Sequence, residues 1–167
     1  MCFSRKTKNK KGFTLLELMI VIAIMGIFLA VAVPKMGSSK TDFRLYTTAR
    51  NLVSDIRYAQ ELSISTKENH GIFFDAPDGV WYEIRNLATN KTIKRINFNT
   101  SVSYKKMVDT ANDPVGDGIV FDSTGKPYED DGVTPLVTLS TVHLEAAGMY
   151  IYVRITPQTG EVSFGRI

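Results

Sequence analysis

The chain of 167 residues has a formal net charge of +3 at neutral pH, but that charge is unevenly distributed. Five of its 20 basic residues and none of its 17 acidic residues lie within residues 1–12, so residues 13–167 carry 15 basic against 17 acidic side chains. The body therefore lacks the strong positive charge of a general nucleic-acid or membrane-surface binder. The length suffices for one domain with a core, and a single cysteine, Cys2, excludes an intramolecular disulfide.

A long apolar segment follows the basic leader. From Phe13 to Val33 only Thr14, Glu17 and Gly26 interrupt it. A helix of this length rises roughly 30 Å, enough to cross the core of a bilayer. A buried core helix and a simple signal anchor are the plain alternatives, but apolar residues on every face argue against a protein core. The basic leader predicts a cytoplasmic N-terminus and an exported remainder.

Glu17 is the unusual residue of this segment. A carboxylate within a membrane span costs free energy and persists where it has a partner, usually a positive charge. No Lys or Arg lies between Gly12 and Lys35. Cleavage after Gly12 would create a cation, the amino group of Phe13, which could pair with Glu17 of a neighbouring copy in a helical stack. A plain anchor offers no such reason for the carboxylate.

The run K-K-G-F-T-L-L-E-L-M-I-V-I-A-I resembles the type IV prepilin cleavage and methylation motif. The resemblance implies that residues 1–12 are a leader peptide, which a prepilin peptidase removes by cutting between Gly12 and Phe13. It further implies that Phe13 becomes N-methylated and that Glu17 is needed for methylation and for docking into a filament.

The same resemblance assigns residues 13–34 to a transmembrane helix that is also the assembly segment. Pro34 falls where pilins commonly carry a helix-kinking proline, and Gly26 matches another small position that loosens the helix. Proline bends or interrupts a helix because it lacks an N–H group and crowds the preceding turn.

Residues 35–66 are predicted to form an amphipathic helix, with the clearest pattern from about Thr41 to Thr66. Apolar residues recur there at spacings of three and four and so share one face: Leu45, Ala49, Leu52, Val53, Ile56 and Ala59. Charged residues are placed mostly away from that face: Arg44, Arg50, Asp55 and Arg57. This helix needs a hydrophobic partner for one of its sides.

Residues 67–167 have the texture of a β-rich domain, expected in the periplasm. The alternation over Met149–Ile155 is typical of a half-buried strand, and 109–135 is expected to be a long variable loop. The other strands are predicted at Gly71–Asp75, Val80–Leu87, Thr92–Phe98, Ile119–Asp122, Leu136–Leu144 and Glu161–Arg166. The predicted fold class is α+β, with a long N-terminal helix packed on antiparallel sheets.

The body resembles a family as well. The helix text A-R-N-L-V-S-D-I-R-Y-A-Q-E-L-S-I and the closing hairpin I-T-P-Q-T-G-E-V-S-F-G-R-I, together with the pilin-like N-terminus, are similar to the GspH/FimT family. The resemblance implies a minor pseudopilin that is assembled into a type II secretion pseudopilus, at or near its tip. The alternative is a minor type IV pilin of a surface pilus, serving assembly initiation, adhesion or FimT-like DNA uptake.

Partners and location follow from this resemblance. The implied partners are the prepilin peptidase and methylase, other pilin or pseudopilin subunits, the inner-membrane assembly platform and inner-membrane lipid. The chain is expected to cross the inner membrane once, with a cytoplasmic N-terminus and a periplasmic C-terminal domain, and then to enter the pilus or pseudopilus.

Enzymatic and metal chemistry find little support in the sequence. His70 and His143 lie far apart, and no H-E-x-x-H, G-x-S-x-G or P-loop pattern is present. The chain is therefore expected not to be an enzyme and to need no cofactor or metal. Acidic residues within 109–135 leave a calcium site as an open alternative, although their spacing does not fit an EF-hand.

Nucleic acid is an unlikely partner, because the chain offers too few suitably placed basic residues. Some FimT-like minor pilins bind DNA through a basic tail that begins at a G-R motif, whereas here Gly165 and Arg166 are followed only by Ile167. Arg166 alone cannot supply the several phosphate contacts of such binding. A second basic group is expected to be a solvated strand face: Lys91, Lys94, Arg95, Lys105 and Lys106.

Overall fold

The computed structural model describes residues 12–32, 36–75, 79–98, 101–111, 113–114 and 116–166, of which 31, 32 and 36–39 are described by their backbone alone. The leader before Gly12 and the predicted kink at Pro34 lie outside the described residues. The chain divides into two compact units, Met1–Ser39 and Lys40–Ile167.

The first unit contains helix α1, Leu15–Ala32. Thr14 is its N-cap, because the Thr14 hydroxyl accepts a hydrogen bond from the N–H of Glu17 at 3.2 Å. The Thr14 carbonyl oxygen accepts further bonds from Glu17 and Leu18, at 3.1 and 3.2 Å. In the described part of the chain, no helix combines the length and the apolar character needed to cross a membrane.

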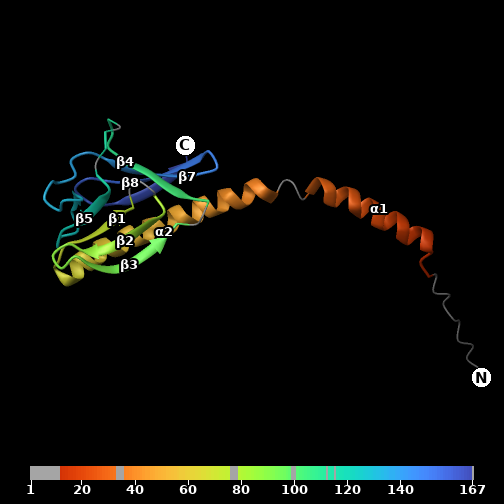
Figure 1. Cartoon of the computed structure of the whole chain (residues 1–167), viewed down its shortest axis with the longest axis horizontal. Coiled ribbons are helices and arrows are strands. Elements are labelled where there is room, and N and C mark those ends of the chain that lie inside the picture. Colours follow the sequence, from red (N-terminus) through yellow and green to blue (C-terminus); the bar gives the residue numbers. More distant parts are fainter. Residues whose placement is uncertain are drawn as a thin grey trace, which may run out of the picture. The chain divides into compact units, whose positions relative to one another are not determined.

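The second unit contains two antiparallel sheets and most of helix α2, Met36–Thr66, which runs alongside their strands in Figure 1. The five-stranded sheet has the order β3-β2-β1-β5-β6, with β1 His70–Phe74, β2 Trp81–Asn86, β3 Lys91–Asn97, β5 Gly118–Phe121 and β6 Pro127–Glu129. The four-stranded sheet has the order β4-β7-β8-β9, with β4 Ser103–Val108, β7 Ser140–Ala146, β8 Met149–Ile155 and β9 Val162–Arg166.

One hydrophobic core joins α2 to both sheets. The six apolar residues predicted to share a face of this helix are all buried, at 6% exposure or less. They pack in one cluster with Ile72 and Phe121 of the five-stranded sheet and with Val142 and Val153 of the four-stranded sheet. The predicted α+β fold, a helix covered by antiparallel sheets, is confirmed.

Polar bonds fix α2 along this core. The Arg57 guanidinium donates to the carbonyl oxygen of Val162 at 3.0 Å. The Gln60 amide donates to the carbonyl oxygens of Gly125 and Thr159. These bonds connect the helix to β9 and to loops of both sheets. Hydrogen bonds are directional, so they fix the position of α2 along the strands more closely than apolar packing alone would.

Asp55 departs from the prediction that the charged residues of α2 lie on its exposed side. It is buried, and its carboxylate accepts a hydrogen bond from the Tyr82 hydroxyl at 2.8 Å and pairs with Lys94 at 2.6 Å. The reason is that β2 and β3 offer a donor and a cation to this flank of the helix. Burial, followed by the Asp55 carboxylate, raises the pKa of Tyr82 far above its ordinary value.

Two strands were missing from the sequence-based prediction. In β4 a bulge between Tyr104 and Lys106 breaks the alternation of exposed and buried residues, which hides the strand pattern. Strand β6 lies inside 109–135, so the expected long loop there is wrong in part. This short strand pairs with β5 and carries too few residues to show a period.

Candidate functional site

The expected processing site has an open geometry. Gly12, Phe13 and Thr14 precede α1 in non-helical backbone, and the Phe13 side chain is 84% exposed. A Cβ placed on Gly12 would meet no atom within 4 Å. The peptide bond between Gly12 and Phe13 is therefore accessible to a protease, and the first helical turn begins two residues beyond it.

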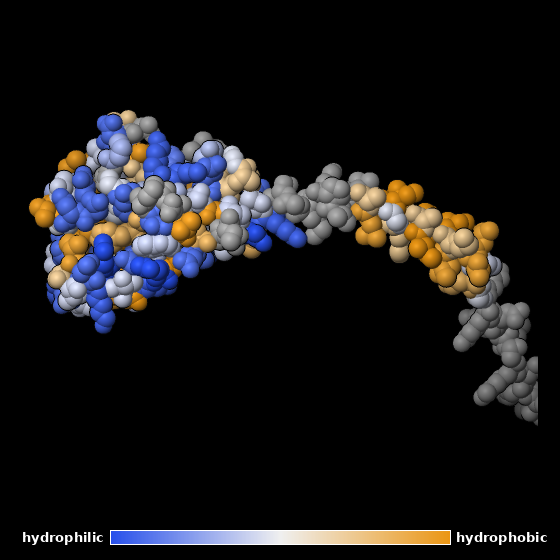
Figure 2. Space-filling model, viewed as in Figure 1, coloured by the Kyte–Doolittle hydropathy of each residue, from blue (hydrophilic) through white to orange (hydrophobic). Residues whose placement is uncertain are grey.

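Helix α1 exposes apolar side chains around its whole circumference, and hydrophobic residues cover most of the face that Figure 2 draws. Its large exposed apolar residues are Leu15, Leu16, Leu18, Met19, Ile20, Val21, Ile22, Ile24, Met25, Ile27, Phe28 and Leu29. Such a surface marks contact with a membrane or with other proteins, because its removal from water is strongly favourable. A Cβ at Gly26 would also meet nothing within 4 Å.

Glu17 lies in the first turn of α1, where a negative charge interacts favourably with the helix dipole. Its side chain is exposed and makes no ion pair within the described residues. Thr14 and Glu17 have the T-x-x-E spacing of a capping box. The sequence analysis missed Thr14, although this spacing together with the following apolar run could have revealed it.

Arg166 lies on β9 in the second unit. Its guanidinium pairs with Asp42 at 3.3 Å and approaches the sulfur of Met149 at 3.6 Å. Three of the five residues in the other predicted basic group have a carboxylate partner: Lys94 pairs with Asp55, Arg95 with Glu83 and Lys105 with Glu145. This arrangement is that of a charged sheet surface rather than of a row of cations available to phosphates.

Asp122 and Asp131, two acidic residues of 109–135, accept hydrogen bonds within turns. Asp131 accepts bonds from Val133 and from both the N–H and the hydroxyl of Thr134. Burial alone would raise the pKa of Asp122, but hydrogen bonds from Thr124 and Lys126 outweigh it and lower that pKa. No cluster of three or more metal-ligating side chains occurs among the residues that the structure describes.

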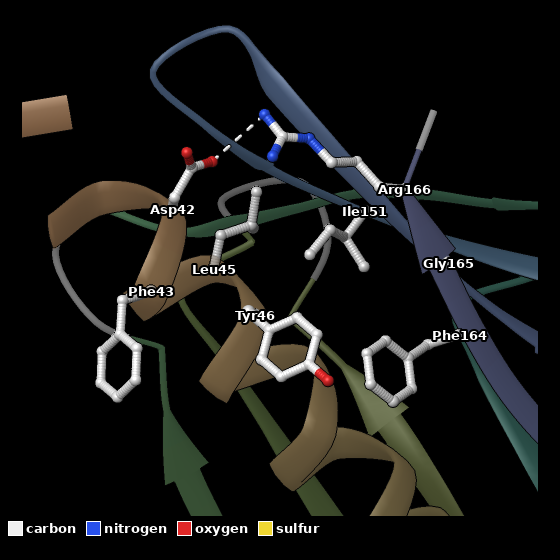
Figure 3. A pocket seen from close by; sticks show the side chains of 8 residues that line it. All are labelled: Asp42, Phe43, Leu45, Tyr46, Ile151, Phe164, Gly165 and Arg166. Carbon is white, nitrogen blue, oxygen red and sulfur yellow. Dashed lines mark ion pairs between the residues drawn. The ribbon is translucent and has the colours of Figure 1, made fainter. Parts of the chain in front are cut away.

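A groove runs between α2 and the edge strand β9, which the sequence analysis did not predict. Tyr46 of the helix and Phe164 of the strand are in edge-to-face contact at this groove, with ring centroids 5.3 Å apart and an interplanar angle of 67° (Figure 3). The cavity at this end measures about 500 Å³. Its lining residues are Asp42, Phe43, Leu45, Tyr46, Ile151, Phe164, Gly165 and Arg166.

The N-terminal segment of the chain is similar in sequence to known proteins. Residues 7–33 match the family model of the prokaryotic N-terminal methylation motif. The type IV major pilin protein PilA of Myxococcus xanthus is 40% identical over 65 residues, and a fimbrial protein of Pseudomonas aeruginosa is 45% identical over 49 residues. These matches cover 33% and 29% of this chain and span only 30% and 29% of the length of the two relatives.

The fold is shared with a minor pilin and a minor pseudopilin. The type IV minor pilin FimU of Pseudomonas aeruginosa superimposes with a TM-score of 0.54 at 18% identity, over 72% of this chain and 87% of FimU. The minor pseudopilin EpsH of the Vibrio cholerae type 2 secretion system gives a TM-score of 0.52 at 12% identity, over 74% of this chain and 97% of EpsH. The chain therefore carries the N-terminal methylation motif in residues 7–33, and its fold is similar to those of a minor pilin and a minor pseudopilin.

Proposed function

We propose that this chain is a type IV pilin-like protein of the GspH/FimT kind and serves as a minor structural subunit, without catalytic activity, of a filament built from pilin-like helices. The observation that carries the proposal is α1: an exposed, all-round apolar helix with one carboxylate in its first turn, directly behind the accessible Gly12–Phe13 bond. Such a helix needs apolar surroundings on every side, which lipid provides first and neighbouring helices of a filament provide later.

In this proposal the apolar segment 13–34, which contains α1, crosses the inner membrane once, with the leader in the cytoplasm and the β-rich unit in the periplasm. A prepilin peptidase cuts after Gly12, and Phe13 is N-methylated. The Glu17 carboxylate then pairs with the Phe13 amine of the adjacent subunit as the helix leaves lipid for the filament. An unpaired charge in an apolar interior is expensive, so this pair favours one register of stacking.

Two filaments are candidates, and each has a structural neighbour with this fold. A type II secretion pseudopilus, the first candidate, is supported by the likeness to the minor pseudopilin EpsH. A surface pilus is supported by the likeness to the minor pilin FimU. Both neighbours are minor subunits, which supports a place at or near the filament tip. Deletion of the gene separates the two: loss of protein secretion supports the pseudopilus, and loss of pili supports the minor pilin.

The decisive experiment is the intact mass and the N-terminal sequence of the protein purified from host membranes. The proposal expects a chain that begins at Phe13 and is heavier by one methyl group. A chain that retains residues 1–12 in cells with an active prepilin peptidase would contradict it, and the protein would then be a membrane-anchored β domain.

The role of Glu17 can be separated from simple helix capping. We predict that Glu17→Ala inserts into the membrane but fails to enter filaments, as measured by its fraction in sheared or cross-linked filament material. Glu17→Gln keeps the N3 side chain that a capping box accepts but removes the charge. Failure of both variants, with normal assembly of Glu61→Ala on the exposed side of α2, indicates the charge pair; assembly of Glu17→Gln would refute it.

A further inference from the structure

Strand β9 forms an open edge of the four-stranded sheet. The N–H of Thr156 donates to the carbonyl oxygen of Glu161 at 2.9 Å, just before the ladder of β8 and β9 begins. Because hydrogen-bonded and non-hydrogen-bonded pairs alternate in an antiparallel ladder, the backbone groups of Val162, Phe164 and Arg166 point away from β8. The bond from Arg57 to the carbonyl oxygen of Val162 agrees with this direction.

The groove beside this edge continues along α2. The cavity at Tyr46 adjoins a second one of about 580 Å³, and Phe164 lines both. Apolar groups dominate the first cavity, where Phe43 is 71% and Tyr46 is 50% exposed. An exposed aromatic pair beside an unpaired strand edge is a surface that proteins normally cover.

The second cavity has a net positive lining, with two arginines against one glutamate. Its lining residues are Arg50, Val53, Ser54, Arg57, Glu161, Val162, Ser163 and Phe164. Arg50 is exposed and has no ion pair within the described residues, and Arg57 donates only to a backbone carbonyl. A carboxylate that entered this cavity would therefore find two guanidinium groups, and both can bind it through parallel hydrogen bonds.

We propose that the groove between α2 and β9 binds an extended segment of a neighbouring filament subunit, which adds a fifth strand to the four-stranded sheet at β9. Its backbone pairs with the outward groups of Phe164 and Arg166. An apolar side chain of the segment enters the cavity at Phe43 and Tyr46, and an acidic side chain lies against Arg50 and Arg57. Backbone pairing supplies affinity in strand addition, whereas the two pockets supply specificity.

A second copy of this chain is a poor occupant of the groove. If β9 of another copy paired with β9, the only charged side chain within the added strand would be Arg166. In an antiparallel pairing, that arginine would lie at the Val162 end of β9, on the Arg50 and Arg57 side of the groove, and like charges in contact oppose pairing. The charge of the groove therefore favours an acidic segment of a different subunit. The source of that segment rests on the proposed filament function.

Photo-crosslinking in the host tests the groove. The photoreactive residue p-benzoylphenylalanine replaces Phe43 in the full chain, and a matched control carries it at Tyr58, which is 45% exposed on the same helix but lines neither cavity. We expect an adduct from position 43 only, and peptide mass spectrometry of that adduct should identify an extended, acidic segment of another filament subunit. Equal adducts from both positions, or an adduct with a second copy, would overturn the proposal.

Two paired variants test the backbone and the charge. Arg166→Ala and Arg166→Pro both lose the ion pair with Asp42, but only proline removes the outward N–H at the edge. The adduct yield from position 43 should be about tenfold lower with proline, the effect of one lost hydrogen bond, at equal thermal stability. Arg50→Glu should also reduce the yield, whereas Arg44→Glu, at an exposed site outside the groove, should not.

The outcomes distinguish this proposal from the filament function. A processed chain that enters filaments but gives no adduct from position 43, or equal yields from the two Arg166 variants, overturns the groove alone. A chain that keeps its leader overturns the filament function, and with it the assignment of the partner to a filament subunit.

Discussion

Helices α1 and α2 belong to one chain, yet their apolar side chains are covered in different ways. In α2 the six core-facing residues are at most 6% exposed, because the two sheets of the same unit cover them. In α1 the large apolar side chains are between 42% and 78% exposed. The apolar face of α2 is therefore covered by its own chain, whereas the apolar surface of α1 has to be covered by lipid or by other proteins.

This difference follows from how the apolar residues are spaced along the sequences of the two helices. Helix α2 repeats its apolar residues at spacings of three and four and presents one stripe, which a sheet surface can cover. Helix α1 has no polar face, so a single sheet would leave most of it in water. Lipid or a bundle of other helices is the environment that covers all sides. In the proposed function, α2 holds the subunit's own domain, and α1 exchanges lipid for neighbouring helices.

The largest predicted effect contrasts the two helices directly. Ile56 of α2 is fully buried, so Ile56→Ala should lower the free energy of unfolding of the body by about 2–5 kcal/mol. Ile24 of α1 is 48% exposed, and Ile24→Ala should change that value by less than about 0.5 kcal/mol. Urea unfolding of the full chain in mild detergent, followed by the fluorescence of the single tryptophan, Trp81 in β2, measures both.

A comparable loss from Ile24→Ala would break the comparison, because it would mean that α1 contributes to the core of the body. A negligible loss from Ile56→Ala would show that α2 does not depend on the sheets.

Replacing one glycine by alanine in each unit should change stability in opposite directions. A Cβ on Gly71 of β1 would lie 2.8 Å from the carbonyl oxygen of Ile119 and 2.8 Å from the Phe73 ring, so Gly71→Ala should destabilise the body by about 1–3 kcal/mol. A Cβ on Gly26 meets nothing, and Gly26→Ala should stabilise α1 by about 1 kcal/mol through helix propensity. Circular dichroism in detergent measures the helix, and urea unfolding measures the body; equal signs would contradict the contrast.

The sequence predicted what depends on local pattern. The spacing of Leu52, Ile56 and Ala59 sufficed to identify the buried face of α2, and the motif around Gly12 and Glu17 sufficed to identify the N-terminal segment. Such features repeat along a few turns of one element and need no knowledge of the rest of the fold.

What escaped prediction depends on which distant elements become neighbours. Asp55 is buried only because Tyr82 and Lys94, far along the chain, bring a donor and a cation to that flank. Strand β9 was predicted as a strand, but its place at a sheet edge follows from the strand order, which local alternation does not encode. The groove beside β9 therefore could not be predicted from the sequence, whereas the N-cap at Thr14 could have been.

The smallest predicted effect is a difference in pH dependence between the two units: the stability of the body should depend on pH, and the helicity of α1 should not. Burial, together with the nearby Lys106 ammonium, lowers the pKa of His143 in the body below its ordinary value of about 6.5. The folded body then binds fewer protons than the unfolded chain between the two pKa values, so its stability should fall as the pH falls from 7 toward 5. His143→Gln should flatten this part of the profile, measured by urea unfolding at several pH values, while the helicity of α1, which contains no histidine, stays constant. Identical profiles for the two proteins would show that the titration of His143 is not coupled to folding.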